Sequence, residues 1–207
     1  MADELGTQPP APAGTSLVPR TPPQAERVHI PVGSSASLLA VVPYLLGFEP
    51  ASSMVIIGTH PCTRQIMLTL RYDLPDPPDL HDAADIAAHA TGILTGQHAS
   101  SAFAVGYGPA RLVTPVAGAL RAAAPPAGLE MPEILRVQGK RYWSSPGAGY
   151  DDLAEGTPFS TASHLAAARL TAEGARVLAG RDELAAGVAA LGGKEGESMD
   201  RATRRAE

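Results

Sequence analysis

The chain has 207 residues, of which 44% are hydrophobic and only 4% aromatic, and its 16 Lys and Arg against 21 Asp and Glu give a formal net charge of −5. A weakly acidic chain without a basic cluster lacks the charge that attracts nucleic-acid backbones and anionic membranes, so we expect neither as a partner. A single cysteine, Cys62, excludes an intrachain disulfide and a thiolate-based structural zinc site, and it fits a reducing, cytoplasmic location.

Residues 1–27 are rich in Pro, Ser, Thr and Gln and contain no apolar run of the length that a signal peptide or membrane span needs. They predict a disordered leader. Residues 28–191 predict a single domain that begins with a short strand at 28–31. Residues 192–207 predict a charged tail, for which the alternative interpretation is the truncated start of a helical second half.

The first helix is predicted to begin at the serines that follow Gly33, because a serine hydroxyl can cap the free N–H groups of the first turn. An apolar stripe continues to Leu46, and Gly47 with the later Pro50 is typical of a helix end. Pro43 lies inside this helix, where it removes a backbone donor. We therefore expect Pro43 to kink or restart the helix.

Two strands, residues 54–58 and 65–74, are predicted to form an antiparallel hairpin across the short polar connection THPCTR. In the second strand, alternation places Ile66, Leu68, Leu70 and Tyr72 on a core face. The other face becomes polar toward its end, with Arg71 followed by Asp73.

Helices and strands then alternate along the chain. We predict a helix from PDPPDLHD to about residue 94, with Leu80 on its apolar stripe, a strand at 101–107, a helix at 110–123 and a hairpin that turns at Gln138-Gly139. Two Ala-rich helices follow, at 160–172 and 181–191. This order predicts an α/β domain, with α+β as the alternative, built on a mixed β-sheet with packed helices.

One helix carries a pattern that resembles a metal site, with His81, Asp85 and His89 spaced four residues apart. These side chains fall on the face opposite the apolar stripe, which predicts a solvated polar face rather than metal ligands. We expect neither a metal nor a cofactor from the sequence.

A second candidate is the turn Gly106-Tyr107-Gly108, which resembles half of a phosphate-cradling loop, with Arg111 on the following helix as an anion partner. The third glycine of the dinucleotide fingerprint is absent, so a plain strand-to-helix turn is favoured over a ligand site at Tyr107 and Arg111.

The third candidate combines Ser52 and Ser53, before one strand, with Arg71 and Asp73 near the end of the next. Arg71 and Asp73 share a strand face, so they predict either an ion pair or a joint ligand site. The ion pair is the favoured interpretation.

Arg141, Tyr142 and Trp143 form a basic and aromatic trio in the last hairpin. Burial is the usual position for a lone tryptophan in a strand. If Trp143 is exposed instead, the trio predicts a binding surface.

Four blocks of the sequence, VPYLLGFEPASSMVIIG, LTLRYDLPDP, VQGKRYWSS and GTPF, resemble an actinobacterial family named only as a domain of unknown function, number four-one-nine-two. The resemblance covers about residues 28–191 and implies an uncharacterised protein with no stated activity. Relatives often carry cysteines after the RYWS-like block, but SPGAGYDDLAEGTPF has none. Relatives also continue into a helical second half.

The sequence contains no nucleophile elbow, P-loop or zinc-protease motif, so a binding or interaction module for an unknown protein or small molecule is the favoured function. The alternative is an enzyme that acts on a polar or phosphorylated small molecule at Ser53, Arg71 and Asp73. An acid–base role would need a raised pKa at Asp73, and a neighbouring arginine lowers it. The sequence therefore favours a protein that is not an enzyme.

Overall fold

The computed structural model of the chain describes residues 34–60, 62–63, 65–144, 155–161, 164–188 and 201–204. The leader predicted at 1–27, the strand predicted at 28–31 and most of the predicted tail lie outside the described residues. In the described part, no helix has both the length and the apolar character needed to cross a membrane.

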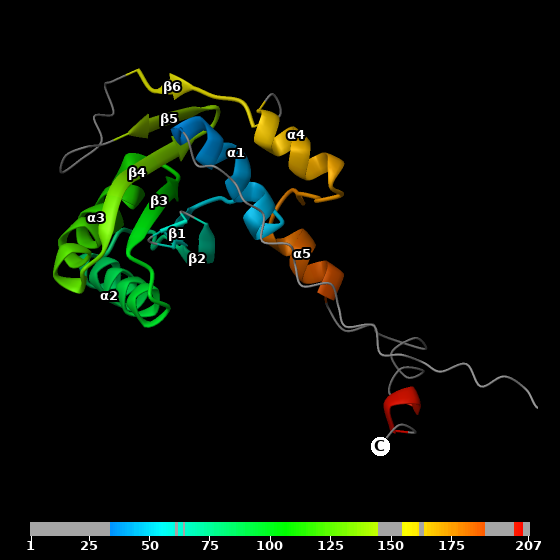
Figure 1. The fold of residues 1–207 in the computed structure, drawn as a ribbon, viewed down its shortest axis with the longest axis horizontal. Helices are drawn as coiled ribbons and strands as arrows, with labels where there is room; N and C mark the ends of the chain where they lie inside the picture. Colours follow the sequence, from blue (N-terminus) through cyan, green and yellow to red (C-terminus); the bar gives the residue numbers. More distant parts are fainter. Residues whose placement is uncertain are drawn as a thin grey trace, which may run out of the picture.

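Six strands form one mixed sheet in the order β2-β1-β3-β4-β5-β6 (Figure 1). The parallel pair is β3 and β4, and the other neighbouring strands are antiparallel. The predicted single α/β domain with a mixed sheet is confirmed. The strands are β1 (Ser53–Thr59), β2 (Ile66–Asp73), β3 (Ser101–Tyr107), β4 (Glu130–Gln138), β5 (Arg141–Ser144) and β6 (Thr157–Pro158).

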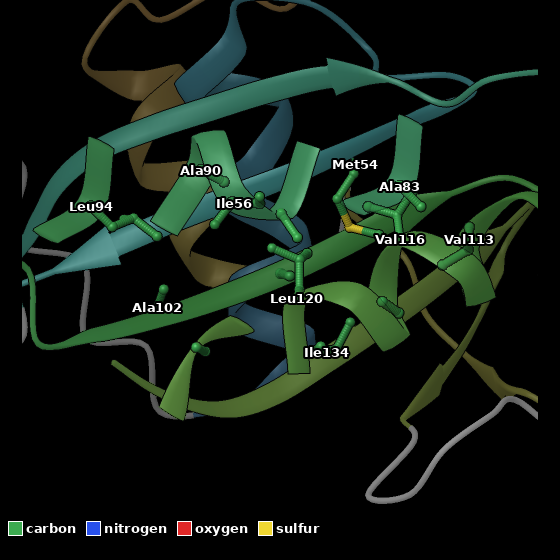
Figure 2. Packing of buried hydrophobic residues seen from close by; sticks show 14 of the residues in the cluster. Met54, Ile56, Ala83, Ala90, Leu94, Ala102, Val113, Val116, Leu120 and Ile134 are labelled. Atoms are coloured by element: carbon green, nitrogen blue, oxygen red, sulfur yellow. The ribbon is translucent and has the colours of Figure 1, made fainter. Parts of the chain in front are cut away.

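Helices cover both faces of this sheet. On one face, α2 and α3 pack over β1, β3 and β4 in the cluster shown in Figure 2, and on the other α1 packs over the same strands. The helix α3 also connects the parallel strands β3 and β4, as such a pair requires. The helices are α1 (Ser35–Leu46), α2 (Leu80–Gly96), α3 (Ala110–Ala123), the 3-10 helix η1 (Pro125–Ala127), α4 (Leu165–Ala172) and α5 (Arg181–Val188).

The ends of α1 follow the prediction, but its interior does not. The Ser34 hydroxyl accepts a hydrogen bond from the N–H of Ser37, and Gly47 ends the helix with φ 79°. The helix continues without a break through Pro43, so the predicted restart is wrong. The carbonyl of Pro43 accepts from the Gly47 N–H at 2.8 Å, and Pro43 is itself buried, so packing and the closing turn hold the helix together past the missing donor.

The hairpin of β1 and β2 is confirmed, but one of its side chains faces the opposite way from the prediction. Ile66 packs on the α1 side of the sheet, whereas Leu68 packs on the α2 and α3 side. A register shift between Gly58 and Thr59 accounts for this, because a bulge adds a residue that strict alternation does not count.

Two helix predictions also need correction. Leu80 was predicted on the apolar stripe of α2, but it is 77% exposed because it is the first residue of the helix. An apolar stripe predicts which side of a helix faces the sheet, but not whether the sheet extends beneath the end of the helix. The helix predicted from residue 160 begins at Leu165, with His164 as its N-cap. Before it, Thr157–Pro158 pair with β5 as a short strand instead.

Candidate functional site

Four residues predicted as site candidates lie together at one end of the sheet, on the α1 face. Ser53 at the start of β1 is opposite Asp73 at the end of β2 and opposite Tyr107 at the end of β3. Paired residues on neighbouring strands point to the same face, and so do residues two apart on one strand, which adds Arg71 to the row. Ser52 precedes the row as an exposed residue with φ 42°.

Three side chains of this row carry buried polar atoms without a hydrogen-bond partner among the described residues: Ser53 Oγ, Arg71 Nε and Tyr107 OH. Buried polar atoms in native proteins are almost always paired with protein, water or an ion. Leaving one unpaired costs about 1–3 kcal/mol. Their concentration in one row therefore indicates a place where polar groups from outside the chain complete the structure.

Arg71 and Asp73 form the ion pair that the sequence favours. Arg71 Nη2 donates to an Asp73 carboxylate oxygen at 2.6 Å, and Arg181 Nη1 approaches the other oxygen at 3.2 Å. The guanidinium of Arg71 also lies over the ring of Phe48, 5.7 Å from its centroid. The hydrogen bond from Arg71 lowers the pKa of the Asp73 carboxyl, so Asp73 is ionised at neutral pH. Arg71 and Asp73 line a hollow of about 580 Å³.

A second hollow lies at the carboxyl ends of β3 and β4, between α1 and the segment that follows β6. We call it the Tyr107 cavity. Its volume is about 370 Å³, and it is lined by Leu39, Pro43, Glu49, Tyr107, Val137, Gly139, Lys140, Phe159, Ser160 and Thr161. Sites of α/β proteins commonly lie at the carboxyl ends of parallel strands.

The wall of the Tyr107 cavity after β6 is held by contacts to the hairpin of β4 and β5. The N–H of Phe159 donates to the Lys140 carbonyl at 3.0 Å. The Phe159 ring packs edge-on against Tyr142, with 6.0 Å between centroids. These contacts fix an aromatic side chain opposite α1, so the cavity has a defined apolar wall.

Glu49 lines both hollows and was not predicted as a site residue. Its N–H donates to the Leu178 carbonyl at 3.0 Å, and the Leu178 N–H donates to Gly47 at 2.9 Å. Partial burial raises the pKa of the Glu49 carboxyl. The one sequence signal for Glu49 is an acidic residue inside the apolar stretch LLGFEPA.

The hydroxyl of Tyr107 is neutral at physiological pH. Burial is the main reason that its pKa lies far above the usual range, and the negative charge of Glu49 adds to the effect. A neutral phenol can both donate and accept a hydrogen bond. Tyr107 thus offers a ligand either function from a largely apolar surrounding.

The turn predicted to resemble a phosphate loop has a structural explanation. A Cβ on Gly106 would lie 2.3 Å from Val113, so this glycine lets α3 pack closely on β3. Arg111 forms a two-pronged ion pair with Asp76, at 2.7 and 3.0 Å. The plain strand-to-helix turn is therefore the better interpretation at Arg111.

A third hollow, of about 400 Å³, lies at the start of α3 beside Arg136 and Trp143. Arg136 is only 1% exposed, and its guanidinium lies 3.8 Å from the centroid of the Trp143 ring. Arg136 also donates to the Gln138 amide oxygen at 2.9 Å. Arg136 was not predicted as a site residue, although a charged residue within the apolar strand EILRV is a signal that could have found it.

The trio of Arg141, Tyr142 and Trp143 does not form one surface. All three are half-buried, and alternation along β5 places Tyr142 on the α1 face but Arg141 and Trp143 on the other. Arg141 donates to the Gly156 carbonyl, and its second nitrogen lies 3.2 Å from Glu155. The trio instead anchors the segment around β6.

The residues that resemble a metal site lie on the solvated face of α2, as predicted. The side chains of His81 and Asp85 are 84% and 70% exposed and lie 3.7 Å apart. His89 accepts or donates a hydrogen bond at 3.0 Å to the hydroxyl of Tyr72. Within the described ranges, no three His, Cys, Asp or Glu side chains gather closely enough to hold a metal ion.

A family model described as "Domain of unknown function (DUF4192)" matches residues 36–207. The match covers well over half of the sequence, so the chain belongs to this family, and the resemblance noted from its sequence blocks is confirmed. No curated protein matches the sequence. The family description states no activity, so the site itself must supply the argument for function.

Proposed function

We propose that this domain is a binding module for a small polar molecule, which the Tyr107 cavity holds. One observation carries the proposal: Tyr107 lines a cavity, and its buried hydroxyl has no hydrogen-bond partner among the described residues. A ligand that bonds to this hydroxyl would remove a cost of about 1–3 kcal/mol from the folded protein.

The composition of the cavity supports a small molecule as the ligand. Binding sites are mostly apolar and carry a few polar groups that fix the orientation of the ligand. Apolar walls come from Leu39, Pro43 and Phe159. Polar groups come from Glu49, Tyr107, Lys140, Ser160 and Thr161. The volume of about 370 Å³ lies near the lower end of the range for such sites.

An enzyme acting at Ser53, Arg71 and Asp73 has less support. Ser53 is fully buried, and it is not among the residues that line the hollow beside Arg71. The lowered pKa of Asp73 leaves it ionised and weakly basic at neutral pH, which suits an ion pair rather than proton transfer.

A thermal-shift screen of the full chain against small polar metabolites, followed by calorimetric titration of the compounds that stabilise it, tests the proposal. A ligand at 100 times its Kd adds about 2.7 kcal/mol of stability. The variant Tyr107→Phe should lose at least tenfold in affinity, since an uncompensated polar contact is worth about 1.4 kcal/mol or more.

The matched control is Tyr72→Phe, which removes a phenol hydroxyl from the opposite face of the sheet. It should bind each compound as the wild type does. Equal affinity of wild type and Tyr107→Phe for every compound would contradict the proposal, and so would a screen in which nothing stabilises the protein.

A further inference from the structure

We infer that the Tyr107 cavity selects a small organic cation, a primary ammonium group on a short apolar body. This inference rests on the proposed function and adds the chemical class of the ligand. The geometry that carries it is the placement of Glu49 and Tyr107 on the same cavity, close enough for the Glu49 charge to act on the Tyr107 hydroxyl.

Glu49 provides a negative charge that nothing else neutralises in the described part of the chain. No hydrogen bond or ion pair of its side chain joins it to a described residue, and its only such contact there is made by its backbone N–H. It is also the one acidic residue among the described residues that line the cavity. Partial burial raises the pKa of the Glu49 carboxyl, and a nearby cation stabilises the ionised form of such a carboxyl.

Among the polar residues of the cavity, Glu49 and Tyr107 discriminate between ligand charges, because the hydroxyls of Ser160 and Thr161 can bond to either kind of ligand. An ammonium group can donate to the Glu49 carboxylate and to the Tyr107 oxygen at once. A ligand carboxylate can accept from Tyr107, but it would face the like charge of Glu49. A neutral hydroxyl can satisfy both groups without the stronger, charge-assisted bond.

Lys140 is the opposing charge on the cavity. It is exposed in the turn between β4 and β5, and its carbonyl, not its ammonium, makes the bond that holds Phe159. Glu49 is also exposed, but it is buried enough to raise the pKa of its carboxyl. The ammonium of Lys140 lies on a longer, flexible stem and can turn into solvent, where water and salt screen its repulsion of a ligand.

The apolar walls limit the body of the ligand. About 370 Å³ has room for roughly a dozen non-hydrogen atoms, at about 30 Å³ for each atom of the size of a water molecule. The ring of Phe159 can contact either the apolar body or the cation itself. The ligand class is therefore a compact amine rather than a nucleotide or a peptide.

The test is a titration of the 15N-labelled full chain, followed by NMR, with three probes of equal length: n-butylammonium, 1-butanol and butanoate. We expect n-butylammonium to bind at least tenfold more tightly than butanoate, with shifts at residues that line the cavity. Since such fragments bind weakly, each titration should extend to about 0.1 M at constant ionic strength.

Two variants separate charge from hydrogen bonding. Glu49→Gln should reduce the affinity for n-butylammonium about tenfold and change that for 1-butanol by less than about twofold. Tyr107→Phe should weaken both. The control Glu130→Gln removes an equivalent charge at the opposite end of the sheet and should change neither.

The outcomes distinguish the inference from the function on which it rests. If butanoate or 1-butanol binds the cavity as tightly as n-butylammonium, the cation class is wrong, but a ligand site at Tyr107 stands. If Glu49→Gln leaves the preference for n-butylammonium unchanged, the assignment to Glu49 is wrong. If no probe shifts residues of the cavity, both the inference and the proposed function are overturned.

Discussion

Replacing Tyr107 by phenylalanine should stabilise the protein when no ligand is present. Tyr107 is 8% exposed and packs with the α1 face of the sheet, and phenylalanine keeps that packing. Only the hydroxyl is lost, and this atom is buried without a partner among the described residues.

The expected gain follows from the cost of an unpaired buried hydroxyl. That cost is about 1–3 kcal/mol, and removing the group recovers it apart from a small loss of packing contacts. With a urea dependence of about 2 kcal/mol per molar, the unfolding midpoint should rise by roughly 0.5–1.5 M. The sign matters more than the size, because most substitutions of buried residues destabilise.

Equilibrium unfolding in urea, followed by the fluorescence of the single tryptophan, measures this change. Tyr72→Phe is the control, because the Tyr72 hydroxyl has a partner in His89 at 3.0 Å, and its loss should destabilise by about 0.5–1 kcal/mol. If Tyr107→Phe is less stable than the wild type without ligand, the hydroxyl has a stabilising partner such as an ordered water. The Tyr107 hydroxyl would then not be an unpaired group that a ligand completes.

Three further predictions concern the fold around the site, each measured by the same urea unfolding. Gly106→Ala in β3 should destabilise by about 1–3 kcal/mol, because its Cβ would lie 2.3 Å from Val113 of α3. The control Gly118→Ala in α3 has open space and should stabilise by up to about 1 kcal/mol, and a neutral Gly106→Ala would contradict the close packing. Asp79→Ala should cost about 1 kcal/mol, because the carboxylate accepts from two N–H groups at the start of α2, and no loss would mean that the cap contributes nothing. The pKa of Asp73 is lowered in the folded protein, so the ionised carboxyl stabilises the fold above the ordinary pKa of 3.8, and this stabilisation is lost as the pH falls below it. Asp73→Asn should cost less than about 1 kcal/mol at pH 7 and weaken the loss of stability in acid, and an unchanged loss in acid would refute the role of the pair.

Local physical chemistry made much of the fold predictable. The cap at Ser34 and the stop at Gly47 depend on backbone geometry within one turn, so neighbouring residues suffice to predict them. The pairing of Arg71 with Asp73 follows from strand alternation alone. A prediction failed where packing outweighed a local preference: Pro43 was expected to restart the helix, but α1 continues through it and buries it.

The site residues that were missed depend on contacts between distant parts of the sequence. Glu49 became a site residue because the segment at Leu178 bonds to its backbone and places it between two hollows. Phe159 lines the Tyr107 cavity because the two residues before it pair with β5. A strand of two residues leaves no recognisable pattern in the sequence, so the wall that follows β6 could not be predicted. Tyr107 was named as a candidate, but without that wall the sequence could not predict the cavity beside it.

The distribution of unfavourable features along the molecule also argues for function at this edge of the sheet. Three unpaired polar atoms at about 1–3 kcal/mol each would remove roughly 3–9 kcal/mol, a large part of the 5–15 kcal/mol that stabilises a typical domain. Ser52 adds a left-handed backbone conformation that disfavours a residue with a Cβ. Violations of local rules that gather in one place are expected at functional sites, where a ligand supplies the missing partners. By this reasoning the end of the sheet that holds Arg71 and Tyr107, both of which line hollows, is where ligand binding should change the stability of the protein. The well-paired Arg111 and the solvated histidines of α2 have no such unpaired buried atoms.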